Sequence, residues 1–227
     1  MTQKTASLTL RVLARLLSYP DAELRSHLGD LGAALRSEQA LGAARLGELE
    51  ALLKSMRTRD PIELEADYVQ LFDRGRSTSL HLFEHVHGDS RDRGPAMIDL
   101  AQTYEKAGLY LAEGELPDYL PVVLEFVSTQ PLREARAFLG EMAHILNAIF
   151  SALVKRQSAY ASVLGALLEI AGEKAQAVKV AEEQAIDESW EEPAVFGGCS
   201  TEGQAKPGQP QPVRIVRNVA QRAASGV

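Results

Sequence analysis

A run of apolar residues with alternating spacings of three and four constrains the fold of this chain more than any other feature. It follows Pro131 and extends over three heptads, through Leu132, Ala135, Leu139, Met142, Leu146, Ile149 and Leu153. This spacing places all of its members on one face of an α-helix. The stripe therefore predicts one long helix, either at the centre of a bundle or along a coiled-coil seam between two copies of the chain.

Shorter stripes of the same kind precede it and favour the bundle, because they supply partner helices within the chain. They predict a first helix that ends before Pro20, one helix over residues 24–35 and another over residues 46–56. The next helix has the clearest start, since Asp60 is a capping residue, Pro61 suits the first helical position and Glu63 completes a capping box. Its buried face is expected to consist of Leu64, Tyr68 and Leu71.

Further helices are expected from Gly94-Pro95 to Leu111, over residues 122–127, and from Tyr160 to Val178. The sequence shows no alternating strand pattern and no Asn-Gly or Asp-Gly hairpin. We therefore predict an all-α fold, with a single helical bundle-like domain over residues 1–186. Residues 187–227 begin acidic, and residues 193–212 contain four prolines and four glycines. This composition predicts a flexible polar tail.

Charge and composition exclude several classes of function. The net charge of −7 argues against a nucleic-acid-binding protein and favours basic polypeptide partners. The single cysteine, Cys199, cannot form a disulfide within the chain or contribute to a zinc site made of thiolates. Because no apolar run approaches the ~20 residues that cross a bilayer, we expect a cytoplasmic protein that does not insert into membranes.

Residues 66–89 concentrate aromatic, histidine and carboxylate side chains, and they allow three interpretations. The first is a zinc peptidase, because His81, Glu84 and His85 form an H-x-x-E-H pattern whose histidines share a helix face. The candidates for a third ligand are Glu141, His144 and Glu169, and none of them belongs to a recognisable signature. The second interpretation, another catalytic centre, lacks a nucleophile elbow, a phosphate loop and a dinucleotide-binding turn.

The third interpretation, a recognition surface, explains more of these residues. Tyr68, Leu71 and Phe72 end one predicted helix, and Leu82 and Phe83 belong to the next. Together they are expected to form an apolar groove ringed by carboxylates: Asp67, Asp73, Glu84 and Asp89. The alternative is that these side chains are ordinary core, above all Leu71 and Leu82. Tyr68 favours the groove, because its hydroxyl suits an edge that meets water.

Two blocks of sequence carry a specific resemblance. The first runs from Asp67-Tyr68-x-x-Leu71-Phe72 through Ser79-Leu80-x-Leu82-Phe83-Glu84-His85-Val86-His87-Gly88-Asp89-Ser90 to Gly94-Pro95-Ala96-Met97. The second is Glu115-Leu116-Pro117-Asp118-Tyr119-Leu120-Pro121-Val122-Val123-Leu124-Glu125-Phe126. Over residues 8–180 the chain resembles the NarJ family of nitrate reductase molybdenum cofactor assembly chaperones, within the TorD/DmsD class of redox-enzyme maturation proteins.

The resemblance implies a chaperone that is not an enzyme. Such proteins bind the N-terminal segment of the catalytic α subunit of respiratory nitrate reductase and delay its attachment to the membrane. Meanwhile they keep it competent to receive the molybdenum bis-guanine-dinucleotide cofactor, which they do not hold stably. A homo-oligomer is possible for such a chain. The rival hypotheses are a generic helical adaptor and the zinc peptidase.

The resemblance also implies which residues bind the peptide. Tyr68, Leu71, Phe72 and Glu84 match the first family block, and Pro117 and Asp118 match the second. Many relatives in the wider class carry histidine where this chain has Tyr119. With the groove residues added, the expected peptide-binding set is Tyr68, Leu71, Phe72, Leu82, Phe83, Glu84, Pro117, Asp118 and Tyr119, with no catalytic or metal-binding residue.

Overall fold

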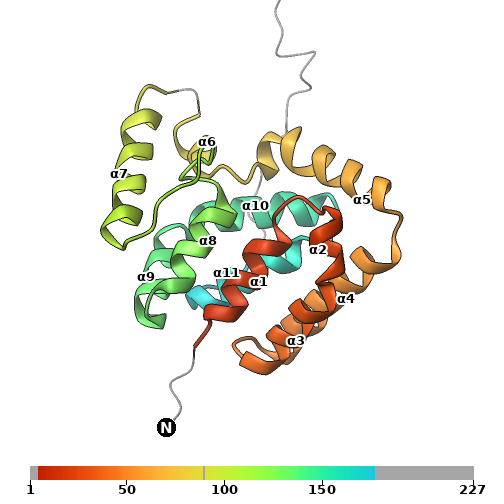
Figure 1. Cartoon of the computed structure of the whole chain (residues 1–227). Helices are drawn as coiled ribbons and strands as arrows, with labels where there is room; N and C mark the ends of the chain where they lie inside the picture. The colour runs from red at the N-terminus through yellow and green to blue at the C-terminus, as the bar shows by residue number, and fades with distance from the viewer. Residues whose placement is uncertain (1–4, 89, 177–227) are drawn as a thin grey trace, which may run out of the picture. The chain divides into compact units, whose positions relative to one another are not determined.

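The computed structural model describes residues 5–88 and 90–176, and this part of the chain is built from helices (Figure 1). Its only extended pairing is an isolated antiparallel bridge between His81 and Tyr119. The α-helices are α1 (Ser7–Leu16), α2 (Ala22–Ser26), α3 (Leu28–Glu38), α4 (Ala43–Thr58), α5 (Pro61–Tyr68), α6 (Leu82–Val86), α7 (Arg93–Lys106), α8 (Leu120–Thr129), α9 (Leu132–Glu141), α10 (Ala143–Lys155) and α11 (Ala161–Ala171). A π-helical turn, Val69–Asp73, continues α5, and a short 3₁₀ turn, Arg76–Thr78, follows.

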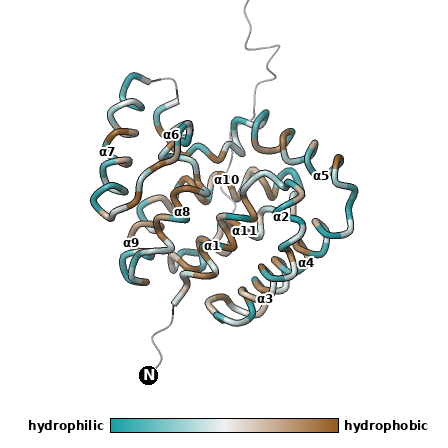
Figure 2. Tube along the Cα trace, in the orientation of Figure 1, coloured by the Kyte–Doolittle hydropathy of each residue, from teal (hydrophilic) through white to brown (hydrophobic). Residues whose placement is uncertain are grey.

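The core forms around α1 and α11. Helix α1 packs against α8 and α3, while α11 packs against α9, α10 and α4 (Figure 1). Figure 2 shows hydrophobic residues along much of α8 and α11, and in α11 Val163, Leu164 and Leu167 are fully buried. The prediction of an all-α bundle is confirmed. The predicted boundary at residue 186 and the predicted tail at 187–227 lie outside the described residues and stay predictions.

Local signals place the ends of several helices as expected. The Asp60 side chain accepts hydrogen bonds from the backbone N–H groups of Ile62 (2.9 Å) and Glu63 (3.3 Å), and Pro61 begins α5. The last helix ends earlier than predicted, at Ala171, because Gly172 adopts a left-handed conformation with φ of 87° that stops the helix. Val178, which was expected to belong to it, lies outside the described residues.

The prediction of one long helix after Pro131 is wrong. The stripe is divided between α9 and α10, which meet at Met142 with a bend of 68°. Met142 has φ of −93° and ψ of 2°, outside helical geometry, and the bend lets both helices pack against α11. Leu139, Leu146, Ile149 and Leu153 are fully buried within the chain. The apolar stripe is therefore part of the core and does not form a coiled-coil seam.

The stripe over residues 24–35 is also divided, into α2 and α3. The break falls at His27, whose φ of −100° and ψ of 2° leave helical geometry. Helix α2 has its own cap, because the Asp21 side chain accepts a hydrogen bond from Leu24 N at 2.7 Å. The break does not change the buried face that the leucine spacing predicts, because Leu24, Leu28 and Leu35 are all buried in the core.

Helix α7 lies at the edge of the described part and packs sparsely. Of its residues only Tyr104 is buried, and Ile98 is 59% exposed. Figure 1 shows it to one side of α8 and α9. The Tyr104 hydroxyl donates to Pro117 O at 2.8 Å, and its ring packs at a tilt against Phe126 with centroids 4.8 Å apart. Near its C-terminus, α7 is therefore fixed by one aromatic side chain.

Among the described helices, none is by itself both long and apolar enough to cross a membrane. Helices α9 and α10 together meet such a criterion by length and composition only, and they are the pair bent by 68°.

Candidate functional site

The two sequence blocks that carry the resemblance lie side by side in the structure. Leu82 N donates to Asp118 O at 3.0 Å, and Leu120 N donates to Leu80 O at 2.8 Å. These two hydrogen bonds form the bridge between His81 and Tyr119. Side chains more than 30 residues apart in the sequence are thereby brought into one cluster.

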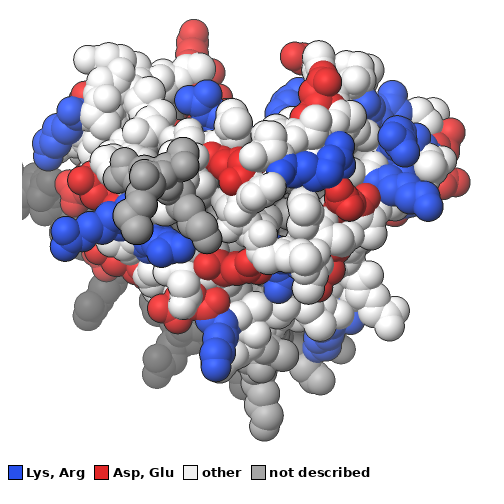
Figure 3. Space-filling view, turned by 90° about the horizontal axis from the view of Figure 1, so that it is seen from below, with Lys and Arg blue, Asp and Glu red and all other residues white. Residues whose placement is uncertain are grey.

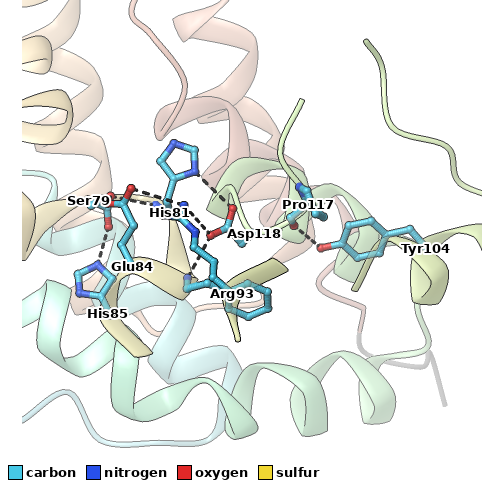
Figure 4. Close-up of polar contacts among 9 residues, drawn as sticks. Ser79, His81, Glu84, His85, Arg93, Tyr104, Pro117 and Asp118 are labelled. Carbon is cyan, nitrogen blue, oxygen red and sulfur yellow. Dashed lines mark hydrogen bonds and ion pairs between the residues drawn. The ribbon is translucent and has the colours of Figure 1, made fainter. Parts of the chain in front are cut away.

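Asp118 is at the centre of this cluster and is fully buried. Its Oδ2 accepts a hydrogen bond from Phe83 N at 3.1 Å and lies 3.6 Å from Arg93 Nη2 (Figure 4). Its Oδ1 lies 3.4 Å from His81 Nδ1. A buried carboxylate is tolerated only when donors and positive charge offset its lost hydration. Here three donors from two segments of the chain do so: His81 and Phe83 at the start of α6, and Arg93 at the start of α7.

A second carboxylate, Glu84, completes what we call the Asp118 cluster: Ser79, His81, Glu84, Arg93 and Asp118. The Ser79 hydroxyl donates to Glu84 Oε2 at 2.5 Å, and Arg93 Nη2 lies 3.6 Å from Glu84 Oε1 (Figure 4). Arg93 opens α7. It therefore ties the start of α7 to α6 and to the segment before α8.

The cluster changes the protonation of His81. The hydrogen bond with Asp118 raises the pKa of His81, burial opposes that rise, and the negative charges of Asp118 and Glu84 add to it. Arg93 lowers the same pKa. The net effect is upward, so the His81 imidazolium is favoured by its surroundings.

His81 and His85 are not placed to bind one zinc ion, as the H-x-x-E-H pattern had suggested. Helix α6 begins at Leu82, so His81 precedes it and turns toward Asp118. The His85 ring turns elsewhere, since its Nε2 donates to Ser79 O at 2.8 Å. The described residues contain no group of three His, Cys, Asp or Glu side chains placed to hold a metal ion. The expectation that His81 and His85 share a helix face is therefore wrong.

Aromatic side chains form a second cluster beside the first. The Tyr68 hydroxyl donates to Leu17 O at 2.7 Å and lies 3.2 Å from the Tyr119 hydroxyl. Because the single Tyr68 proton is used on Leu17 O, Tyr119 is the donor between the two hydroxyls. The Tyr68 ring also packs on Phe72, with centroids 4.9 Å apart, and burial raises the pKa of Tyr68.

Several residues of the expected peptide-binding set are therefore not on the surface. The exposed fractions are 3% for Tyr68, 5% for Phe72 and 1% for Leu82. The expectation that Tyr68 and Phe72 line an open groove is wrong for this conformation, because their rings are enclosed by other aromatic rings. Pro117 and Asp118 are buried as well. Leu71, Phe83 and Tyr119 are half-buried and Glu84 is exposed, so these four residues reach the surface.

A cavity of about 460 Å³ lies next to the buried rings, between α4, α5, the π-helical turn and the turn that joins α10 to α11. Of the expected set only Leu71 lines it; Met56 and Tyr160 do so as well. Sequence reasoning assigned Met56 and Tyr160 to helix faces, and no local signal marks them as cavity residues. A second cavity of similar volume lies between α1, α8 and the loop before α8, where Tyr110 is 80% exposed.

The surface carries both signs of charge. On the face shown in Figure 3, Lys and Arg side chains alternate with Asp and Glu, and neither sign forms one continuous patch. Acidic residues exceed basic ones over the whole chain, 31 to 24.

The fold first defines a class of protein. A solved structure from Archaeoglobus fulgidus, titled as that of "a putative redox enzyme maturation protein", matches with a TM-score of 0.53 at 23% identity. The match covers 76% of this chain and 98% of that chain. At this identity the similarity shows a shared helical fold.

The sequence then defines the family. The family model described as "Nitrate reductase delta subunit" matches residues 22–166, and the chain belongs to that family. Escherichia coli (strain K12) NarJ, a nitrate reductase molybdenum cofactor assembly chaperone, is 42% identical over 196 residues, covering 82% of this chain and 83% of NarJ. A Bacillus subtilis relative, named "Probable nitrate reductase molybdenum cofactor assembly chaperone NarJ", is 34% identical over 74% of this chain and 90% of its own.

These findings confirm the resemblance to the NarJ family. The named relatives are assembly chaperones and not catalysts, so the chain belongs to a family of non-enzymes. They also support a chaperone role for it.

Proposed function

We propose that this protein is a dedicated chaperone of respiratory nitrate reductase. It binds the N-terminal segment of the catalytic α subunit in the cytoplasm and keeps that subunit competent to receive its molybdenum bis-guanine-dinucleotide cofactor before membrane attachment. It does not hold the cofactor stably. The observation that carries the proposal is the 42% identity to E. coli NarJ over more than four-fifths of both chains.

The surface residues of the expected set suit a peptide ligand. Leu71, Phe83 and Tyr119 present apolar and aromatic surface, and Glu84 adds a carboxylate. An amphipathic helix binds such a surface through apolar side chains spaced three and four apart. The net negative charge would steer a basic leader segment toward the protein.

The buried members of the set have a different part in this proposal. Tyr68, Phe72, Leu82, Pro117 and Asp118 hold the surface residues in place and do not touch the peptide. Asp118 fixes the start of α6 through Phe83 N, and Tyr68 fixes Tyr119 through its hydroxyl. Substituting these buried residues is expected to destabilise the fold and thereby weaken peptide binding.

The test is a titration of the full-length protein with a synthetic peptide copied from the N-terminal segment of the cognate α subunit. We expect saturable binding by calorimetry and a rise in the unfolding temperature that grows with peptide concentration. A scrambled peptide of the same composition and charge is the control. Equal binding of both peptides, or of neither, would reject the proposal and favour a generic adaptor.

A second measurement follows the client. In cells that lack their own NarJ-type chaperone, expression of this chain is expected to restore the molybdenum content of the cognate α subunit. A variant that no longer binds the peptide is the control and should restore much less.

A further inference from the structure

Helix α7 is attached to the rest of the described chain by side chains near its two ends (Figure 4). Arg93, at its start, has its Nη2 3.6 Å from both Asp118 Oδ2 and Glu84 Oε1. Tyr104, near its end, donates its hydroxyl to Pro117 O at 2.8 Å. Both attachments therefore reach the same dipeptide, Pro117-Asp118, just before α8.

Between these two attachments the inner face of α7 is only partly covered. Met97 and Leu100 precede Tyr104 by seven and four residues, so the three side chains share one helix face. Tyr104 is buried, whereas Met97 and Leu100 are half-buried and Ile98 beside them is 59% exposed. A helix with so little buried apolar surface opens at a lower free energy than the core helices do.

A glycine with a positive φ flanks α7 on each side. Gly88 precedes the helix with φ of 51°, and Gly108 follows it with φ of 78°. A Cβ added at either position would meet no atom of the described residues within 4 Å. Glycine adopts many backbone conformations at little cost, so the chain can pivot at these two positions without displacing packed neighbours.

The residues that hold α7 belong to the expected peptide-binding set: Glu84, Pro117 and Asp118. Of these three, Glu84 reaches the surface and offers its carboxylate to a basic leader segment in the proposed function. In the free protein Arg93 faces that carboxylate. The separation of 3.6 Å is longer than a hydrogen bond, so charge alone holds Arg93 there. A basic side chain of the client therefore competes with Arg93 for Glu84.

We infer that α7 is a strap that the client releases. A basic residue of the client's N-terminal segment displaces Arg93 from Glu84, and the start of α7 then moves away from Asp118, which keeps its contacts with Phe83 N and His81. Met97 and Leu100 become fully exposed only while the client is bound. The inference rests on the proposed function, because the client peptide is what releases the strap.

Binding and release are linked in both directions. If the client favours the open strap, a chain whose strap is already open binds the client more tightly by the same factor. The closed strap reduces the apparent affinity by the fraction of molecules in which it is open. Opening can therefore be measured in the helix itself and in the affinity for the peptide.

Hydrogen–deuterium exchange of the full-length protein, with and without the cognate peptide, follows the strap directly. We expect saturating peptide to accelerate amide exchange in Arg93–Lys106 by at least about threefold, because the helix opens more often. Exchange in α6 should become slower, since the peptide covers Phe83 and Glu84. A peptide that only covers the surface slows exchange where it binds and accelerates it nowhere.

Arg93→Gln opens the strap without a peptide. In this variant α7 should exchange rapidly from the outset, added peptide should accelerate it no further, and the peptide affinity should rise by about three- to tenfold. The matched control is Arg91→Gln, which makes the same charge change at an exposed position two residues earlier. An exposed charge is screened by salt, so this control should change the affinity by less than about twofold.

The outcomes separate the inference from the proposed function. Specific binding of the peptide with unchanged or slower exchange in α7 would overturn the inference and leave the proposed function standing. An affinity of Arg93→Gln no higher than that of Arg91→Gln would do the same. Failure of the wild type to bind the peptide would reject the proposed function, and the inference with it.

Discussion

Nδ1 of His81 lies 3.4 Å from Oδ1 of Asp118, across the bridge that joins the two sequence blocks. The Asp118 side chain is fully buried, whereas the His81 side chain is 32% exposed. Arg93 approaches the same carboxylate from the start of α7. One buried charge thus joins three segments: the start of α6, the start of α7 and the residues just before α8.

The first prediction concerns pH. Because Asp118 raises the pKa of His81 in the folded protein, the pair contributes stability that is fully present below the unfolded histidine pKa of about 6.5. That contribution is lost as pH rises through the higher folded value. The free energy of unfolding, measured by denaturant titration between pH 5 and 9, should fall over this window more in the wild type than in His81→Gln. Identical profiles for the two proteins would show that the pair does not contribute.

If His81 also contacts the client peptide, the affinity of the protein for that peptide will depend on pH over the same window. We expect the affinity to change between pH 6 and 8 in the wild type and to be flatter in His81→Gln. A flat wild-type profile would assign the histidines of this segment no part in binding.

The second prediction concerns Asp118 itself. Asp118→Asn removes the buried charge and presents an amide N–H₂ to groups that are themselves donors, so we expect a loss of about 2–4 kcal/mol in the free energy of unfolding. Because Arg93 loses its buried partner, amide hydrogen exchange should accelerate most in α7. Asp99→Asn, an exposed change on the same helix, is the control and should alter neither quantity. Uniform acceleration across all helices would show that α7 is not selectively released.

The third prediction concerns Gly75, between the π-helical turn and the 3₁₀ turn. A Cβ added there would lie 2.5 Å from the Leu71 carbonyl oxygen and would also collide with the Thr78 hydroxyl, which donates to that same oxygen. Since a backbone atom cannot move aside cheaply, Gly75→Ala should destabilise the protein by about 1–3 kcal/mol, measured by thermal unfolding. The control is Gly47→Ala in α4, where a Cβ meets nothing within 4 Å. That change should be neutral or stabilising by up to about 1 kcal/mol.

The fourth prediction concerns Glu38, at the end of α3. Its carboxylate accepts from Thr9 N (2.6 Å), Leu8 N (3.2 Å) and the Thr5 hydroxyl (2.8 Å), so it caps the start of α1 from another helix. Glu38→Ala should cost about 1–2 kcal/mol of stability, the usual value of a helix cap. Exposed Glu113→Ala is the control and should leave the unfolding temperature unchanged.

The Glu38 carboxylate also makes the stability of the protein depend on pH. Partial burial raises its pKa, but the hydrogen bonds from Thr9, Thr5 and Leu8 outweigh that effect and the net pKa is lowered. Its stabilisation is therefore present above the ordinary glutamate value and is lost as pH falls through the lowered one. Between pH 5 and 3 the wild type should lose more stability than Glu38→Gln. A parallel decline would contradict this cap.

The helical class and most helix starts follow from the sequence. Leucine spacing predicts the buried faces, and the Asp60-Pro61 signal predicts the start of α5, because spacing and capping depend on residues within one turn of each other. The resemblance carried by the two sequence blocks identifies the family, which the comparisons confirm. The positions and contacts of these two blocks in the folded chain do not follow from their sequence.

Only the tertiary structure decides how these local elements are used. The apolar stripe after Pro131 bends by 68° at Met142, and the bend lets both α9 and α10 bury their apolar faces against α11. Tyr68 and Phe72 become core because the ring of Tyr160, about 90 residues later, packs against theirs. His81 and His85 face different partners because Asp118 joins this segment from beyond α7. The sequence by itself determined which segments are helical and which family they belong to, since both are written in short-range patterns. Burial, side-chain direction and cavities depend on contacts between distant residues, and only the folded chain brings those residues together.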